Sequence, residues 1–304
     1  MKIIIVTGPS ATGKTSLALQ YAKECDGELV NFDSRQIYKK LDIITGKDKE
    51  IIKNFKFPYV PQGKQTSNLI WLYDLVDPKE YFSSFDFTQT AMKVLMHILK
   101  RKKTPILVGG TYLYLYHLLY QVQTENIPPN IKLREKLNEF PVKNLQQKLV
   151  EIDKPLFASL NESDKKNPQR LIRKIEIASF YKKKGIKVPT KMKFIFNDFF
   201  KDKNIEFIGL TFHDREKLLS TIKLRVDKRL QEGAIDEVKK LLTQGYTEND
   251  PGMKTIGYQQ VMRYLKGKIT KQLAIDEWIL REFQYTKRQL TFMKKDPNII
   301  WKYI

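Results

Sequence analysis

Short apolar runs rich in β-branched residues recur along the chain and predict buried strands. They occupy residues 2–7, 28–32, 70–76, 105–108 and 205–210. Residues 14–25 and 86–102 carry apolar side chains at helical spacing and lie between these runs. Because strands and helices alternate, we expect an α/β fold with a parallel, doubly wound sheet.

The middle of the chain follows a different pattern, because residues 121–200 are rich in lysine and hold few β-branched runs. Helical spacing recurs there and again after residue 211, over residues 131–139, 143–152, 168–184, 214–232, 234–244, 257–265 and 270–294. The apolar tail 299–303 is expected to form an edge strand. We therefore expect an α/β core formed by residues 1–120 and 201–304, ending in helices, with a helical insertion domain at 121–200.

The charge of the chain is strongly positive and unevenly distributed. The 55 Lys and Arg residues outnumber the 34 Asp and Glu residues, which gives a formal net charge of +21. Residues 1–100 hold 14 basic and 11 acidic side chains, so most of the excess lies in residues 101–304. Such a surface suits a polyanionic partner, although charge alone does not separate a nucleic-acid-binding protein from a merely lysine-rich one.

Cysteine content and the first residues indicate the compartment. Cys25 is the sole cysteine, which excludes an intrachain disulfide and a zinc site built from several cysteines. The opening MKIIIVTG contains an apolar run too short for a signal-peptide core or a membrane span. We expect a cytoplasmic protein without a membrane partner, and a monomer as the default state.

A glycine-rich loop between the first strand and the first helix matches G-x-x-x-x-G-K-[ST]. Its glycines let backbone N–H groups point inward as an anion nest, and the following helix adds the positive end of its dipole. Lys14 supplies a mobile charge for a terminal phosphate, and Thr15 offers a hydroxyl to Mg²⁺. The predicted diphosphate-binding residues are Gly8, Pro9, Ser10, Ala11, Thr12, Gly13, Lys14 and Thr15.

This loop indicates a di- or triphosphate ligand but not which one. An ATPase or kinase would supply a second acidic residue, at a strand end, for its metal ion. Asp74 and Asp77 lie near a predicted strand, but no apolar run ends cleanly in a lone acid, and residues 105–108 lead into Gly109-Gly110-Thr111. The absence of a clear second acidic residue at a strand end weakens the interpretation as an NTPase without excluding it.

Asp33 follows the second predicted strand, so its carboxylate is expected at the same edge of the sheet as the phosphate loop. There it can accept a proton from a nucleophile that attacks the phosphorylated ligand. The same position also suits an N-cap for the segment 35–38, and spacing alone leaves both roles open.

Several sequence blocks occur in order along nearly the whole chain, among them Asp33-Ser34-Arg35-Gln36-Ile37-Tyr38 and Lys287-Arg288-Gln289, and together they resemble the bacterial tRNA dimethylallyltransferase family. The phosphate loop is shared with many proteins, whereas the Asp-Ser-x-Gln-Ile-Tyr block that begins at Asp33 and the Lys-Arg-Gln block near the C-terminus are far more specific. The resembling segments are 8–15, 32–38, 41–43, 105–114, 167–170 with Arg173 and Glu176, 225–238, 256–258 and 286–292.

The resemblance implies transfer of the dimethylallyl group of dimethylallyl diphosphate to N6 of adenosine 37, beside the tRNA anticodon, with release of diphosphate. The phosphate loop would hold the diphosphate together with Mg²⁺, which Thr15 would bind. Asp33 would be the general base for the adenine amino group. Thr111 would lie where base and diphosphate meet, and Arg225 would add charge to the leaving diphosphate.

The resemblance also implies contacts to the tRNA anticodon stem-loop. Without it, Arg170 and Arg173, three residues apart on a predicted helix, would be interpreted as an exposed face. The implied contact residues are Asp33, Ser34, Arg35, Gln36, Arg134, Gln169, Arg170, Arg173, Lys254, Gly257, Tyr258, Lys287, Arg288 and Gln289.

The chain departs from the family pattern in three places, one of which is Thr221, at a position where a basic residue is common. Residues 42–48 read Asp-Ile-Ile-Thr-Gly-Lys-Asp where the family usually has Asp-Ile-Gly-Thr-Ala-Lys-Pro, which changes backbone freedom and leaves the role of this loop open. Glu282-Phe283-Gln284 stand where Thr-Arg-Gln is common, and Arg281 lies nearby as a replacement cation.

Three rival functions stay open at this stage. An adenylate isopentenyltransferase would use the same donor on a free nucleotide, which needs no basic surface of this extent. A small-molecule P-loop kinase would consume ATP, and a non-catalytic RNA-binding protein would carry the loop as a vestige.

Overall fold

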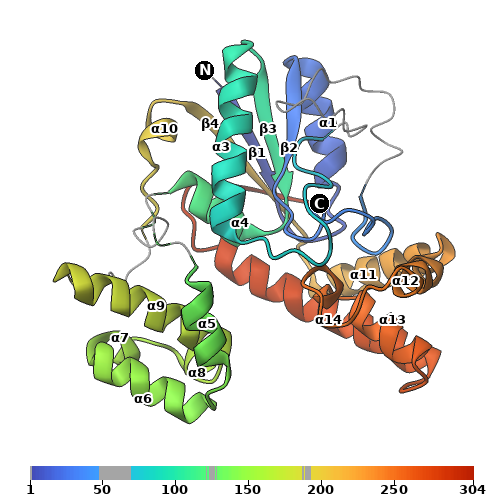
Figure 1. Cartoon of the computed structure of the whole chain (residues 1–304). Coiled ribbons are helices and arrows are strands. Elements are labelled where there is room, and N and C mark those ends of the chain that lie inside the picture. Colours follow the sequence, from blue (N-terminus) through green and yellow to red (C-terminus); the bar gives the residue numbers. More distant parts are fainter. Residues whose placement is uncertain are drawn as a thin grey trace. The chain divides into compact units, whose positions relative to one another are not determined.

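The computed structural model describes residues 2–47, 70–120, 129–186 and 193–304, together with 122, 127 and 188. The chain divides into two compact units, of which the first comprises Met1–Leu119 and Phe196–Ile304 and the second Tyr120–Ile195 (Figure 1). The boundaries expected from the sequence lie at residues 120 and 201. Within the described ranges, no helix is long and apolar enough to cross a membrane.

The first unit is built on a five-stranded parallel sheet with the order β2-β3-β1-β4-β5. The central strand β1 pairs with β3 on one side, where Ile4 lies opposite Ile106, and with β4 on the other. This arrangement confirms the predicted α/β class and the C-terminal edge strand. The strands are β1 (Lys2–Thr7), β2 (Gly27–Asn31), β3 (Thr104–Gly109), β4 (Asn204–Thr211) and β5 (Ile300–Tyr303).

Helices cover both faces of this sheet. Helix α1 (Lys14–Glu24) packs Ala18, Leu19 and Ala22 against the face that carries Ile4 and Val6 of β1. The chain then returns from β2 to β3 in the opposite direction, so right-handed crossovers place α3 (Ser84–Lys100) on the other face. Figure 1 shows the two helices on either side of the strands, so the sheet is doubly wound.

Residues 70–76 do not form the predicted strand. Only Trp71 and Val76 make isolated bridges, to Val30 and Tyr38 respectively. Leu72 and Asp74 have φ angles of 70° and 54°, a left-handed backbone that cannot continue a strand. The apolar run is buried for another reason, because its side chains pack beside β2 as an irregular segment.

The rest of the first unit is helical and forms a second apolar core around the fully buried Trp278. Ile37, Tyr38, Leu41 and Ile44 from the segment after β2 are part of this core, which fixes that segment against the C-terminal helices. The helices are α4 (Tyr112–Leu119), α10 (Asp198–Lys201), α11 (Arg215–Gln231), α12 (Ala234–Thr243), η1 (Gly252–Lys254), α13 (Tyr258–Leu265) and α14 (Lys271–Met293).

The second unit is a small helical domain with its own apolar core. Leu145 and Leu149 of one helix pack with Leu171 and Ile175 of another at its centre. Its helices are α5 (Ile131–Asn138), α6 (Val142–Ile152), α7 (Lys154–Ala158), α8 (Glu162–Lys165) and α9 (Pro168–Lys184).

Candidate active site

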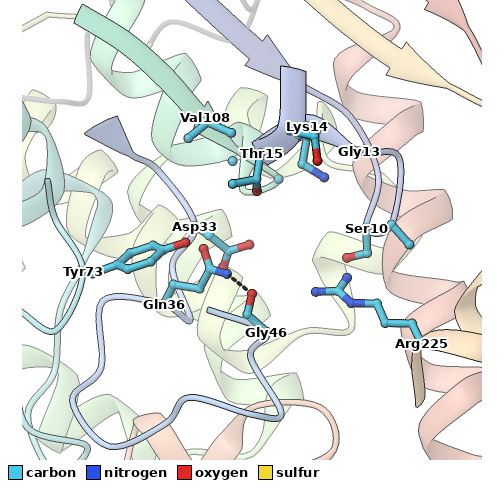
Figure 2. A pocket seen from close by; sticks show the side chains of 14 residues that line it. Ser10, Gly13, Lys14, Thr15, Asp33, Gln36, Gly46, Tyr73, Val108 and Arg225 are labelled. Carbon is cyan, nitrogen blue, oxygen red and sulfur yellow. Dashed lines mark hydrogen bonds between the residues drawn. The ribbon is translucent and has the colours of Figure 1, made fainter. Parts of the chain in front are cut away.

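A cavity of about 230 Å³ lies at the carboxyl ends of β1, β2 and β3, where ligands bind in parallel α/β sheets. Figure 2 shows Arg225 at one side, its guanidinium pointing toward Ser10, with Asp33 and Thr15 near the centre. The lining residues are Ser10, Ala11, Gly13, Lys14, Thr15, Ser16, Asp33, Gln36, Gly46, Tyr73, Val108, Gly109, Gly110 and Arg225.

The phosphate loop has the backbone geometry of an anion nest. Gly8 has a φ of 141°, and a β-carbon there would lie 2.2 Å from the carbonyl oxygen of Leu210, so only glycine fits. Ala11 and Gly13 are also left-handed, with φ angles of 65° and 74°. The Lys14 ammonium and the Thr12 hydroxyl both donate to the Pro9 carbonyl, which holds the loop curled.

The two oxygens of Asp33 have different surroundings. Oδ1 accepts the backbone N–H of Arg35 at 2.9 Å and caps the turn that follows β2. Oδ2 faces Gly110 of the cavity wall, 3.7 Å from the place where a β-carbon of that residue would stand. No donor among the described residues bonds Oδ2. One carboxylate therefore caps the turn and also presents an oxygen to the cavity.

Thr111 joins the ends of β2 and β3 beside this carboxylate. Its hydroxyl accepts the backbone N–H of Ser34 and donates to the Ser34 hydroxyl. Gln289 of α14 accepts the backbone N–H of Tyr112 at 3.1 Å and so holds the start of α4. Residues from three distant segments thus meet next to Asp33 and Gly110 of the cavity wall, and Thr111 itself is not a lining residue.

Tyr285 is a residue of this group that the sequence reasoning missed. Burial raises the pKa of its phenol, and the nearby Asp33 carboxylate raises it further. A hydrogen bond with the Thr111 hydroxyl lowers the pKa of Tyr285, but by less than burial raises it. Its position immediately before the 286–292 block, which the sequence had already singled out, is the signal that could have found it.

The loop at residues 42–48, which departs from the family pattern, contributes Gly46 to the cavity wall. Gln36 donates through its side-chain amide to the Gly46 carbonyl at 2.9 Å, the bond drawn in Figure 2. The Glu237 carboxylate of α12 accepts the backbone N–H groups of Asp42, Ile43 and Ile44 at 2.9, 2.6 and 3.2 Å. One partly buried acid on a distant helix therefore fixes three consecutive residues of the loop.

Lys47 stabilises the same loop through buried hydrogen bonds and ion pairs. Its side chain is fully buried, and the ammonium donates to the Tyr38 carbonyl at 2.6 Å and to the carboxylates of Asp42 and Asp74. Asp74, considered above as a metal ligand, is thus paired with this ammonium. Asp48, the last residue of the departing segment, lies outside the described residues.

The predicted tRNA contacts divide into exposed and inward-facing side chains. Gln169, Arg170, Lys254, Lys287 and Arg288 are exposed, as a contact surface requires. Gly257 and Tyr258 are buried, and the Tyr258 hydroxyl donates to Glu237 behind the loop. Gln289 is bonded to Tyr112 as described above. These three residues support the site from behind in this structure.

Arg134 and Arg173 in the second unit bond a common carboxylate. Glu176 is buried and accepts from Arg134 at 2.7 Å, from Arg173 at 3.0 Å and from the backbone of Asn130 at 2.9 Å. Burial alone would raise the pKa of Glu176, but the hydrogen bonds from the two arginines outweigh it and hold the pKa below its usual range. The exposed Arg170 bonds Asp164 instead.

The comparisons with known proteins agree on one family over most of the chain. The family model described as IPP transferase matches residues 36–296. The tRNA dimethylallyltransferase of Acetivibrio thermocellus is 33% identical over 98% of this chain and 90% of its own length.

Two solved structures have the same fold. The full-length tRNA isopentenylpyrophosphate transferase of Bacillus halodurans is 31% identical, covers 99% of this chain and 89% of its own, and superposes with a TM-score of 0.65. A eukaryotic dimethylallyltransferase acting on tRNA is 25% identical, with coverage of 99% and 73% and a TM-score of 0.72. With a phosphate nest, an adjoining acid and these relatives, the chain belongs to the IPP transferase family.

Proposed function

We propose that the chain transfers the dimethylallyl group of dimethylallyl diphosphate to N6 of adenosine 37 in the tRNA anticodon loop and releases diphosphate. The observation that carries this proposal is that a free oxygen of Asp33 and the anion nest of residues 8–15 face one cavity. The cavity thus offers a proton acceptor and a diphosphate cradle side by side, and this alkylation needs both.

The diphosphate must leave with little help from the nucleophile, because the lone pair of an adenine amine is delocalised into the ring. As the allylic C–O bond breaks, its electron pair passes to the diphosphate oxygens. Backbone N–H groups of the loop, Lys14 and Arg225 line the cavity where that charge develops. Preorganised donors of this kind are often worth several kcal/mol of barrier.

The donor set also fits a divalent metal ion, and we propose Mg²⁺. The Thr15 hydroxyl is an oxygen donor on the cavity wall and would be a ligand of the ion. The described residues contain no group of three or more His, Cys, Asp or Glu side chains suited to a metal. Oxygens of the substrate diphosphate would therefore complete the coordination, and the ion would neutralise charge on the leaving group.

Asp33 takes the proton that the amine loses. As the new C–N bond forms, the N–H proton passes to Oδ2, which accepts no hydrogen bond from the described residues. Oδ1 is held by the Arg35 N–H, so the carboxylate is oriented before the base arrives. Proton removal of this kind contributes roughly a hundredfold or more to the rate.

The base must leave its stack to reach the cavity, which loop bases do at lower cost than paired ones. We propose that the exposed Gln169 and Arg170 of the second unit and Lys254, Lys287 and Arg288 of the first contact the anticodon stem-loop. Basic contacts to phosphates set the register, and contacts to base edges select. All proposed catalytic residues lie in one chain, so a monomer suffices.

Mass spectrometry of nucleosides tests this function directly. Unmodified anticodon stem-loop RNA is incubated with the protein, Mg²⁺ and dimethylallyl diphosphate, and AMP replaces the RNA in a parallel reaction. We expect dimethylallyl adenosine from the RNA alone, and Asp33→Asn should lower its rate at least a hundredfold while RNA binding persists. Prenylation of AMP in place of RNA, or phosphate transfer from ATP, would contradict the proposal.

A further inference from the structure

Two arginines and one glutamate form a charged cluster behind the cavity. Arg225 and Arg229 lie one turn apart on the same face of α11. Arg225 lines the cavity, whereas Arg229 is buried with 4% of its surface exposed. The Arg229 guanidinium donates to the Glu282 carboxylate of α14 at 2.7 Å, and the Trp278 indole donates to the same oxygen at 2.9 Å.

Gly46 shows how close the two guanidinium groups lie. A β-carbon at Gly46 would stand 2.7 Å from Nη2 of Arg225 and 2.8 Å from Nη2 of Arg229. Both side chains thus reach the same point on the loop wall, and neither could do so beside a larger residue. The left-handed φ of 66° at Gly46 also favours glycine.

Two cations at this distance repel each other strongly in a poorly solvated site. Burial lowers the pKa of Arg229 to about 10, and the charge of Arg225 contributes to the shift. Burial would raise the pKa of Glu282, but the charges of Arg229 and Arg225 outweigh it and hold that pKa low. Glu282 is thus ionised and cancels one of the two positive charges.

Arg225 differs from its neighbour in having no hydrogen-bonded acid. Across the described residues, no carboxylate lies within ion-pair distance of its guanidinium, whereas Arg229 has Glu282. Because Glu282 is paired with Arg229, its negative charge does not attract Arg225 away from the cavity. One positive charge therefore remains, and it faces the diphosphate nest.

We propose that Glu282 and Arg229 are positioning residues, which hold Arg225 over the cavity and leave its charge for the leaving diphosphate. This inference rests on the proposed function, because it assigns a diphosphate to the cavity. It also assigns a purpose to Glu282, whose carboxylate is bonded to both Arg229 and Trp278.

Single and paired substitutions separate positioning from general stability. Glu282→Gln leaves Arg229 uncompensated beside Arg225, so we expect the KM for dimethylallyl diphosphate to rise about tenfold, with less effect on the KM for RNA. Arg229→Met leaves Glu282 free to pair with Arg225, with the same result. Arg229→Met combined with Glu282→Gln removes both charges, and the donor KM should return to within about threefold of the unmodified protein.

Binding of inorganic diphosphate with Mg²⁺, measured by calorimetry, gives a readout independent of transfer. It should weaken in both single variants and recover in the double one, even if the acceptor proves to be something other than tRNA. Glu232→Gln, an exposed acid that pairs with Lys228 at the end of α11, is the matched control and should change nothing.

Gly46→Ala provides a test that leaves every charge in place. Its β-carbon would displace both guanidinium tips, so the donor KM and the diphosphate affinity should worsen as in Glu282→Gln. The inference is overturned if diphosphate binding is unchanged in Glu282→Gln and Gly46→Ala, or if the double variant is no better than the single ones.

Discussion

The hydroxyl of Thr111 accepts the backbone N–H of Ser34 at 3.0 Å and donates to the hydroxyl of the same residue at 3.1 Å. Since Ser34 follows Asp33 directly, this pair of bonds fixes the backbone that carries the proposed base. The two residues come from segments 77 positions apart in the sequence. A single buried threonine thus aligns the ends of two neighbouring strands.

Thr111→Val should lower kcat by about tenfold, because it removes both bonds while keeping the shape of the side chain. Thr111→Ser keeps the hydroxyl and should retain most of the activity. Single-turnover transfer to RNA measures the difference, with donor binding as the control. Equal rates in the valine and serine variants would show that the hydroxyl does not position Asp33.

Glu237→Gln should destabilise the protein by about 2 kcal/mol, because the loop at Asp42–Ile44 would lose charge-assisted bonds from its backbone. Tyr258→Phe removes one further bond to the same acid and should cost about 1 kcal/mol. Urea unfolding measures both. The control is Asp236→Asn, because Asp236 is exposed and lies one residue away; it should change the free energy of unfolding by only a few tenths of a kcal/mol. If Asp236→Asn destabilises the protein as much as Glu237→Gln, Glu237 has no special role in holding the loop.

Glu176 should make the stability of the chain sensitive to acid. Its pKa is depressed in the folded state, so its contribution is complete above the usual value of 4.5 and is lost as pH falls below that value through the folded pKa. Glu176→Gln should cost about 3 kcal/mol at neutral pH, and the difference from the unmodified protein should shrink in the acid range. Urea unfolding between pH 7 and 3, on the order of one titration per pH unit, tests the sign; a difference independent of pH would contradict it.

Arg170→Ala should weaken binding of the anticodon stem-loop and reduce the slope of log affinity against log salt by about 1. Asp164→Asn is the matched control, because it removes the acid that pairs with Arg170 and should leave binding intact or tighter. Filter binding across a salt series measures both. If neither the affinity nor the slope changes in Arg170→Ala, that arginine does not contact RNA phosphate.

The sequence was sufficient for the fold class and for the family, because both depend on local patterns. A β-branched run, a glycine loop and a helix predict the phosphate nest within thirty or so residues of chain, and Asp33 follows from the rule that parallel strands end at one edge. The two roles left open for Asp33 are compatible. Its Oδ1 atom caps the turn after β2, and its Oδ2 atom is left for the proposed role as a base, a division that residue spacing cannot resolve.

Other features could not be read from the sequence because they depend on distant packing. The run 70–76 is buried like a strand, yet its backbone turns at Leu72 and Asp74. The hydrophobicity of a residue does not predict its φ angle. The pairing of Arg229 with Glu282 joins two helices that are 53 positions apart at these residues. No local pattern distinguishes such a buried pair from an exposed charged face.

The strand order has a consequence for how the chain is made. β1 is synthesised first, but its second neighbour β4 begins only at Asn204, after the whole second unit has been translated. One side of the central strand therefore lacks its partner while the helical unit can already fold on the ribosome. Nascent chains stalled before Asn204 should be aggregation-prone and in need of a chaperone, and release should come only once β4 has emerged.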